Sequence, residues 1–383
     1  MQGGVGAFTQ ELAKELANLG HEIWILTSKD ARPATANLRL YRSHQEPMQL
    51  GDYAQWLPYG RKWNWSDVSW IADTTERYDF DIVNIQYQAA AYNMRNPAIN
   101  FAPFRLRHLA KTVVTFHDLR TPYLFPKAGG LRKRVVHQMA KSTDGVIVTN
   151  RQDFAKLDGA TGKPLEQIPI GSNITVHPVS EADRRRTRQQ LGLNSHDFLL
   201  GYFGFLNESK GADTLLNALA QLDEHVHLVF IGGRTGASDP DNNQSFYEQL
   251  DVQVEQLGLL DRVHWTGFVE DEQVSQLMAS ADLMVMPYRD GVSLRRGTLM
   301  AALAHGRPLI STQPQVATPE LVHGENVWLV SAENATELSE AITHLRSHQE
   351  LRATLSEGAT KLSQQFQWDK IASQTADFYE SLL

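Results

Sequence analysis

Short apolar segments alternate with helical segments along the whole chain, and this alternation limits the fold more than any other feature. Strands are predicted in the first half at residues 21–27, 81–86, 112–116 and 145–149, and in the second half at 197–203, 227–231, 263–265, 282–286 and 308–311. Helical spacing marks residues 8–19, 181–191, 212–222, 245–257 and 272–280. Apolar strands separated by helices are typical of a parallel sheet covered on both faces. The sequence therefore predicts two doubly wound α/β domains, joined near residues 173–195.

Charge is unevenly shared between the two halves of the 383-residue chain. Residues 1–180 carry 21 Lys and Arg against 16 Asp and Glu, whereas the remainder carries 15 against 28. Basic residues concentrate in residues 105–141, which include Arg132, Lys133 and Arg134. They form either a patch for an anionic substrate or membrane surface, or a solvated helix face. A pI near 6.0 and the lack of a recognition motif argue against nucleic acid binding.

Other composition features exclude several classes of protein. No apolar run approaches the roughly 18–20 residues of a membrane span, and no charged-then-apolar leader occurs. The absence of cysteine excludes disulfides, thiolate metal sites and a cysteine nucleophile. The 14 histidines show no metal-ligand spacing. We expect a cytoplasmic protein without a bound metal, with a peripheral contact at the inner membrane face through Arg132–Arg134 as an alternative.

The strongest candidate for a binding site lies in residues 287–306, where a polar, glycine-punctuated loop runs into an apolar helix. Arg295 and Arg296 stand directly before Gly297 and Thr298. A helix N-terminus offers unpaired amides and partial positive charge, and guanidinium groups pair well with phosphate oxygens. The segment predicts either a phosphate site or an ordinary loop-to-helix junction with solvated arginines.

Three further segments carry candidate functional residues. Gly3, Gly4 and Gly6 precede the first helix, where a glycine loop permits close approach to a ligand, or they form only a flexible chain start. His117 ends the third strand, either as a functional group or as a structural cap. Lys210, after the first strand of the second domain, either meets a phosphate or is solvated.

Aromatic residues are concentrated in residues 53–70, which hold four tryptophans and two tyrosines. Aromatic faces pack well against sugars and lipids, so this segment is one candidate for an acceptor surface. The other interpretation is a small satellite core beneath a long connection.

Five segments occur in one order: GGVGAFTQELAKELANLGHEIWILT, TFHD, FGFLNESKG, TGFVEDEQVSQLMASADLMVMPYRDG and AALAHGRPLIST. Together they resemble the retaining, GT-B-fold glycosyltransferases of family 4. The resemblance implies two Rossmann-like domains facing a cleft, with the acceptor domain at 1–175 and the nucleotide-sugar domain at 176–365. Residues 366–383 would form a helix that crosses back to the first domain.

The resemblance also implies roles for individual residues. A sugar would pass from a nucleoside diphosphate donor to a hydroxyl of a glycan, a lipid-linked acceptor or a small molecule. The donor would be a substrate, and no cofactor or metal is implied. The implied contacts are Gly4 and Gly6 near the donor diphosphate and sugar, His117 at the transferred sugar or acceptor, Lys210 at the diphosphate, Gly267, Phe268 and Val269 around the nucleobase, Asp290 at sugar hydroxyls, and the Gly297 and Thr298 amides at the phosphates.

The chain departs from the family pattern at two functional positions. Ala301 stands where the family has a ribose-binding glutamate, and Phe205 stands where it has a phosphate-binding arginine. We expect Arg295 or Arg296 to replace that positive charge. A nucleotide-sugar epimerase of the same fold and a catalytically degenerate nucleotide- or glycan-binding protein are the alternatives to a transferase.

A third departure concerns the first strand, which in the family precedes the glycine segment. This sequence starts at Met1 and Gln2, directly before those glycines. A central strand missing from the sheet would leave backbone groups of its neighbours unpaired. We therefore expect a gap or an altered order in the middle of the first sheet, and a complete six-strand order there would contradict this expectation.

Overall fold

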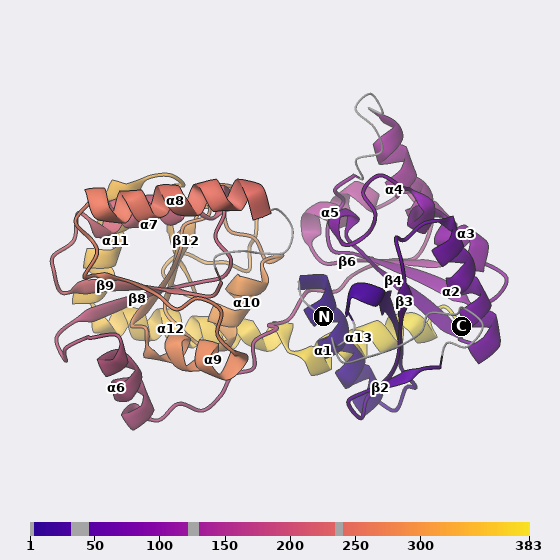
Figure 1. The fold of residues 1–383 in the computed structure, drawn as a ribbon, viewed down its shortest axis with the longest axis horizontal. Coiled ribbons are helices and arrows are strands. Elements are labelled where there is room, and N and C mark those ends of the chain that lie inside the picture. The colour runs from indigo at the N-terminus through magenta and orange to yellow at the C-terminus, as the bar shows by residue number, and fades with distance from the viewer. Residues whose placement is uncertain (1–3, 32–45, 122–129, 234–239) are drawn as a thin grey trace. The chain divides into compact units, whose positions relative to one another are not determined.

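The computed structural model of the chain describes residues 4–31, 46–121, 130–233 and 240–383 (Figure 1). The chain divides into two compact units. Unit 1 comprises Met1–Ile170 together with Trp368–Leu383, and unit 2 comprises Gly171–Gln367. Both units contain mainly parallel β-structure with helices beside it, so the prediction of two Rossmann-like α/β domains is confirmed.

Unit 2 is built on a single six-stranded sheet with the order β10-β9-β8-β11-β12-β13, in which every pairing is parallel. Its strands are β8 (Phe198–Phe203), β9 (Val226–Ile231), β10 (Val263–Trp265), β11 (Leu283–Met286), β12 (Leu309–Thr312) and β13 (Trp328–Val330). Its helices are α6 (Glu181–Gln190), α7 (Ala212–Leu219), α8 (Pro240–Gln256), α9 (Asp271–Ser280), α10 (Gly297–Ala304), α11 (Ala335–Ser347) and α12 (Gln349–Ser363).

The two central strands of unit 2 are anchored at their amino ends by one carboxylate. Asp282 accepts hydrogen bonds from Arg184 and Arg188 of α6, each at 2.8 Å, and from the backbone N–H of Leu199, also at 2.8 Å. A partly buried carboxylate is stable when its oxygens are paired in this way. Leu283–Met286 and most of Phe198–Phe203 are buried, as expected for strands covered on both faces.

Unit 1 contains two separate sheets, one with the order β1-β3-β2 and one with the order β4-β5-β6-β7. Its strands are β1 (Trp24–Ser28), β2 (Met48–Leu50), β3 (Ala54–Gly60), β4 (Ile82–Tyr87), β5 (Lys111–Phe116), β6 (Gly145–Val148) and β7 (Leu165–Gln167). Its helices are α1 (Gly4–Asn18), α2 (Trp65–Tyr78), α3 (Ala102–Leu106), α4 (Gly130–Ser142), α5 (Arg151–Leu157) and α13 (Trp368–Glu380). Among the described residues of unit 1, no strand connects β1 with β4, as expected for the predicted gap in the sheet.

The aromatic segment forms β3 and the start of α2 and contributes mostly to the core. Trp56 and Trp70 are buried, while Trp63 packs against the same core as Trp70. Trp65 is 56% exposed, and its ring lies 5.6 Å from that of Phe101. Three of the four tryptophans therefore support packing rather than an acceptor surface.

The last helix of the chain completes the core of unit 1. In α13, Trp368 places its ring 5.2 Å from Phe8 of α1. Gly145, at the start of β6, is required for this packing because a Cβ there would lie 2.7 Å from Leu382 and 2.8 Å from Phe378. Figure 1 shows α13, in yellow, beside α1.

Candidate functional site

The carboxyl edge of the unit 2 sheet has a topological switch point between β8 and β11. From β8 the chain proceeds to β9 and β10 on one side, whereas β11, β12 and β13 extend on the other. Loops that leave two such neighbouring strands diverge, and this is where open α/β sheets bind ligands. Lys210 is in the loop after β8, and Asp290, Arg295 and Arg296 are in the loop after β11.

These two loops are held tightly against each other. Gly211 has φ +72°, and a Cβ at this position would lie 1.9 Å from the carbonyl oxygen of Pro287. The backbone N–H of Arg289 donates to the Ser209 carbonyl at 3.0 Å. The Arg289 guanidinium also pairs with Asp213 at 2.6 Å, which fixes the β11 loop to the start of α7. The loops therefore form a preorganised support for the side chains that they carry.

This contact predicts a large stability effect. Gly211→Ala introduces a methyl group against backbone and strains a left-handed residue, so we expect it to lower the free energy of unfolding by roughly 3 kcal/mol or more. Gly258→Ala is the matched control, because Gly258 has φ +67° with no atom within 4 Å of a built Cβ. Denaturant unfolding of both variants measures the difference, and equal losses would show that the Pro287 contact is unimportant.

Two cationic side chains lie over the ring of one buried tyrosine. The Arg296 guanidinium carbon is 3.9 Å from the ring centroid of Tyr288, and Lys210 Nζ is 5.2 Å from it. Tyr288 is only 1% exposed, and its hydroxyl is hydrogen-bonded to the Thr298 hydroxyl at 2.8 Å. Arg296 also pairs with the Asp290 carboxylate. The structure thus brings together four residues predicted from the sequence: Lys210, Asp290, Arg296 and Thr298.

Positive charge is in excess at this cluster. Burial and, to a smaller extent, the neighbouring Arg296 lower the pKa of Lys210 to about 8, while Asp290 opposes the shift. Arg296 Nε is buried and has no hydrogen-bond partner among the described residues. Two cations beside one carboxylate leave a net charge that an anion would neutralise. The electrostatics therefore favour an anionic ligand.

The first turn of α10 borders the same cluster. No side chain in the described part of the chain caps this helix at Arg296. Gly204 has φ +125°, and a Cβ there would lie 2.6 Å from Thr298 Cγ2, so glycine permits the β8 loop to approach the turn closely. The backbone N–H groups at Gly297 and Thr298 belong to the helix end that carries partial positive charge. This arrangement is suited to phosphate oxygens.

Two exposed aromatic rings follow β8 and β10, the strands on either side of β9. Phe205 is 49% exposed and Phe268 is 75% exposed. Gly233 lies near both, since a Cβ there would be 3.6 Å from the Phe205 ring and 3.9 Å from Phe268 Cβ. Val269, which follows Phe268, is half-buried. Exposed rings at a sheet edge provide apolar faces for a flat ligand.

In unit 1, His117 follows β5 and is held by its neighbours. Its Nε2 is hydrogen-bonded to Gln86 Oε1 at 2.9 Å, and the Phe8 ring of α1 lies 4.7 Å from the imidazole. Burial lowers the pKa of His117 to about 4, so the ring is neutral at pH 7. A neutral imidazole can donate or accept a hydrogen bond but supplies no charge.

The prediction of a loop at the amino end of the chain was wrong. Gly4 and Gly6 were predicted to precede the first helix, but α1 begins at Gly4. The backbone of this turn is helical, and the Thr9 hydroxyl donates to the Val5 carbonyl at 2.7 Å. Glycine raises the entropic cost of a helical turn without preventing it. Gly3 lies outside the described residues.

Other predicted residues have clear positions. Arg295 is exposed, and its Nε donates to Ser293 Oγ at 3.4 Å. Ala301 is fully buried in α10, so its side chain makes no contact with solvent. Tyr288 and Arg289, which the sequence analysis did not select, organise the site. The sequence signal that could have indicated them is their place directly after a buried strand at the switch point.

The described residues contain neither a metal-binding cluster nor a membrane-spanning helix. No group of three or more His, Asp or Glu among the described residues could hold a metal ion. None of the described helices is long and apolar enough to cross a membrane. Lys133 and Arg134 are exposed on α4, and the Arg132 side chain is outside the described set.

Known proteins share this sequence pattern and fold. The model of the family Glyco_transf_4, "Glycosyltransferase Family 4", matches residues 2–174, and that of Glycos_transf_1, "Glycosyl transferases group 1", matches residues 183–362. A D-inositol 3-phosphate glycosyltransferase of Corynebacterium aurimucosum is 23% identical, with 98% of this chain and 90% of that protein covered.

Solved structures agree with this assignment. Sucrose-phosphate synthase from Thermosynechococcus elongatus shares the fold, with a TM-score of 0.75, 22% identity, and coverage of 99% of this chain and 94% of that one. Anabaena HepE in complex with UDP and glucose has a TM-score of 0.67 and 26% identity, over 82% of this chain and 81% of that one. The protein is therefore a GT-B-fold glycosyltransferase and belongs to family 4.

Proposed function

We propose that this glycosyltransferase moves a sugar, with retention of anomeric configuration, from a nucleoside diphosphate donor to a hydroxyl acceptor. The observation that carries the proposal is the pair of cations, Lys210 and Arg296, over Tyr288 beside the uncapped start of α10. This is a charge surplus at a helix N-terminus, in a position where open α/β sheets bind ligands. A diphosphate would neutralise this charge and accept hydrogen bonds from the helix amides.

The donor contacts follow from this placement. Lys210, Arg296 and the amides of Gly297 and Thr298 would bind the diphosphate. Phe205 and Phe268 would offer ring faces to the nucleobase, with Gly267 and Val269 beside it. Asp290, which is half exposed while paired with Arg296, would accept hydrogen bonds from sugar hydroxyls. The complex of HepE with UDP and glucose makes uridine the first base to test.

The chemical contribution of these residues is electrostatic. As the bond between the anomeric carbon and the phosphate oxygen breaks, negative charge grows on the departing diphosphate. Lys210, Arg296 and the α10 amides are already positioned to stabilise that charge, so little reorganisation is needed during the reaction. The acceptor hydroxyl would then attack on the face that the diphosphate leaves and release its proton to the departing diphosphate oxygen. Attack on that face retains the configuration.

Phe205 stands where the family has a phosphate-binding arginine. We propose that Arg296 supplies the positive charge that this arginine would provide. Arg296 supplies a guanidinium within the site, and Phe205 presents an exposed ring at the end of β8. Arg296 would provide the phosphate charge, and Phe205 would provide an apolar surface for the base. This compensation favours an active transferase over a degenerate copy.

The proposed activity is tested by incubating the protein with UDP-, GDP-, ADP- and TDP-linked sugars, with and without carbohydrate or lipid-linked acceptors. We expect free nucleoside diphosphate and a new glycoside, with the anomeric configuration of the donor by NMR. Interconversion of the nucleotide sugar without diphosphate release would identify an epimerase instead. Binding without any turnover across the acceptor panel would identify a non-catalytic protein.

His117 is proposed to contact the transferred sugar or the acceptor. We expect His117→Ala to lower sugar transfer by about 10-fold or more, because a positioned hydrogen bond is lost, and to leave the nucleoside diphosphate dissociation constant unchanged. Because the pKa of His117 is about 4, its contribution should be constant above pH 5 and should fall as pH approaches 4. Steady-state kinetics with calorimetric binding would measure both, and equal losses in binding and transfer would contradict this role.

The basic face of α4 is proposed as a peripheral contact with an anionic membrane surface. Lys133 and Arg134 are exposed on this helix. Anionic lipid surfaces attract such residues by about 1 kcal/mol each, and salt screens the attraction. Sedimentation with phosphatidylglycerol vesicles would measure this contact. Loss of sedimentation at high salt, and in the double variant Lys133→Gln, Arg134→Gln, would support it. Equal sedimentation of the variant would contradict it.

A further inference from the structure

Gln86, near the end of β4, is the polar partner of the His117 ring. Its Oε1 lies 2.9 Å from His117 Nε2. Gln86 is paired with Thr115 in the parallel β4–β5 ladder, and the His117 backbone N–H donates to the Tyr87 carbonyl at 3.0 Å. The backbone that carries both side chains is therefore held in register by the sheet.

This hydrogen bond determines which ring nitrogen of His117 carries the proton. An amide oxygen has lone pairs and no proton, so Gln86 Oε1 can only accept, and His117 Nε2 must donate. The pKa of about 4 keeps the ring neutral at pH 7. In a neutral imidazole with its proton on one nitrogen, the other nitrogen has a free lone pair. His117 therefore presents Nδ1 as a hydrogen-bond acceptor.

The position of the ring is fixed, and Nδ1 is available to a ligand. Phe8 of α1 packs against the imidazole edge to face, at an interplanar angle of 80°, and the Phe8 ring in turn contacts Trp368. No group among the described residues is hydrogen-bonded to His117 Nδ1. His117 is half-buried, so its ring is not closed off from solvent. A ligand at this end of β5 would meet a lone pair of defined direction.

The carboxylate next to His117 is engaged elsewhere. Asp118 accepts hydrogen bonds from Gln88 Nε2 at 3.1 Å and from the backbone N–H of Arg120 at 3.0 Å. Burial is the cause of the lowered pKa of His117, and no charged group of the described residues contributes to it. A carboxylate partner would favour the protonated ring, whereas the amide of Gln86 leaves it neutral. His117 is thus suited to orient a hydroxyl and not to hold its proton.

We propose that Gln86 is a positioning residue for sugar transfer: it accepts the Nε2 proton of His117 and fixes the tautomer whose Nδ1 accepts a hydrogen bond from a hydroxyl of the bound sugar. The group that this arrangement selects is a hydroxyl that donates its proton. The substrate part of this inference rests on the proposed transferase function, whereas the tautomer is a property of the protein alone.

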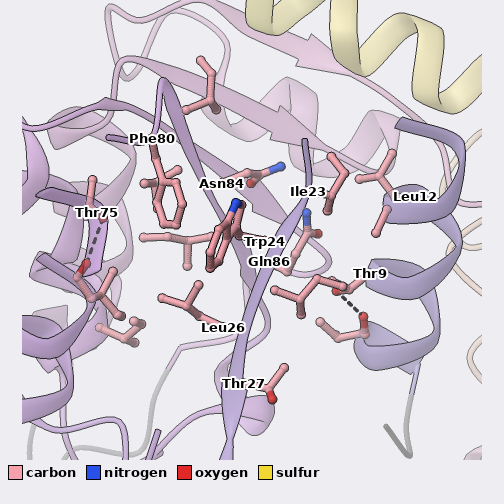
Figure 2. Close-up of a pocket in the computed structure, with 18 of the residues that line it drawn as sticks. Thr9, Leu12, Ile23, Trp24, Leu26, Thr27, Thr75, Phe80, Asn84 and Gln86 are labelled. Atoms are coloured by element: carbon pink, nitrogen blue, oxygen red, sulfur yellow. Dashed lines mark hydrogen bonds between the residues drawn. The ribbon is translucent and has the colours of Figure 1, made fainter. Parts of the chain in front are cut away.

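The surroundings of Gln86 allow it to be replaced. It lines a cavity of about 1150 Å³ in unit 1, together with Thr9 of α1 and Trp24 of β1 (Figure 2). A side chain of similar volume at this position therefore does not overpack the core. Gln86→Leu removes the acceptor, and Gln86→Glu keeps an acceptor oxygen while adding a negative charge.

The tautomer is measured by ¹⁵N NMR of the full chain labelled at histidine, with His117→Ala to identify the His117 signals. We expect the proton on Nε2 in the wild type at pH 7 and a mixture of tautomers in Gln86→Leu. Gln88→Leu is the matched control, because Gln88 is also half-buried but bonds Asp118. It should leave the tautomer unchanged. A wild-type proton on Nδ1, or the wild-type tautomer in Gln86→Leu, would overturn the proposal.

Kinetics separate positioning from a general structural role. We expect Gln86→Leu to lower kcat for sugar transfer about threefold to tenfold, the range for loss of one hydrogen bond, and to leave the nucleoside diphosphate dissociation constant unchanged. In the His117→Ala background the same substitution should have no further effect, since both changes remove one shared contact. Equal losses in the two backgrounds would show that Gln86 acts by another route.

Gln86→Glu tests the same contact through pH. A carboxylate beside Nε2–H favours the charged ring, so the pKa of His117 should rise from about 4 to about 5 or higher. A protonated Nδ1 cannot accept, so transfer by this variant should approach the wild-type rate above the raised pKa. It should fall as pH drops through that pKa, at a higher pH than in the wild type. An unchanged His117 pKa with an unchanged pH profile would contradict the contact.

The substrate is tested with donor and acceptor sugars whose non-reacting hydroxyls are replaced one at a time by fluorine, which cannot donate a hydrogen bond. We expect the wild type to transfer with one of them about 10-fold more slowly, and His117→Ala to lose this difference. Equal rates with all of them would overturn hydroxyl donation to Nδ1. A protein that transfers no sugar would contradict the proposed function, while the NMR result would still decide the role of Gln86.

Discussion

Replacing Arg296 by glutamine is expected to lower kcat/KM for the nucleotide sugar by about 100-fold or more, because removal of one preorganised group that stabilises transition-state charge typically has this effect. Arg296 lies over the Tyr288 ring and is only 14% exposed in its side chain. A partly buried guanidinium is screened less by water and salt than an exposed one. The loss should appear mainly in kcat, with a smaller effect on nucleoside binding.

Arg295 provides the matched control for this change. It is adjacent in sequence, has the same charge and is exposed. We expect Arg295→Gln to change kcat/KM by less than about threefold, since exposed charges contribute little. Similar losses in both variants would show that the effect is one of general charge. A large loss confined to Arg295→Gln would show that the wrong arginine has been assigned to the diphosphate.

Lys210→Ala is expected to weaken nucleoside diphosphate binding about 100-fold and to leave nucleoside binding nearly unchanged. The reason is that an ammonium contributes only where phosphate charge is present, and charge-assisted hydrogen bonds are among the stronger ones. Calorimetry with UDP and uridine measures the two effects separately. Equal weakening of both ligands would place Lys210 away from the phosphates.

The same lysine gives a pH dependence with a definite sign. Burial lowers the pKa of Lys210 to about 8, so the free enzyme carries this charge below pH 8 and loses it as pH rises through that value. Diphosphate affinity should therefore fall above pH 8 in the wild type. Lys210→Arg, which stays charged, should hold its affinity at higher pH. An affinity that is constant from pH 7 to 9.5 in the wild type would contradict this assignment.

Much of the fold could be predicted from periodicity because most core strands are continuous apolar runs. Phe198–Phe203 and Leu283–Met286 lie within one residue of their predicted bounds. Ala54–Gly60 was not predicted as a strand, although β3 is the middle strand of its sheet. It contains Pro58, and proline normally argues against a central strand. Tertiary packing of its buried aromatic residues outweighs that local preference.

The candidate site could be predicted by residue but not by geometry. The sequence indicates Lys210, Arg296 and Thr298, but it cannot show that all three surround Tyr288, since side-chain direction depends on how two distant loops meet. The sequence also cannot distinguish Arg295, whose side chain is exposed, from Arg296, whose side chain is mostly buried. The glycine segment was predicted to precede the first helix because glycines favour a loop, whereas the helix formed by the following residues extends back to Gly4.

The binding of a nucleoside diphosphate at Lys210 and Arg296 is tested most directly by thermal unfolding of the full chain with UDP, GDP, ADP and TDP, each beside its nucleoside. At 100 times its dissociation constant a bound ligand stabilises the folded protein by about 2.7 kcal/mol. We expect one diphosphate to give a saturable shift that its nucleoside does not match and that Arg296→Gln reduces. A folded protein that shows no shift with any of the four, or the same shift with nucleoside and diphosphate, would contradict a diphosphate site at these residues.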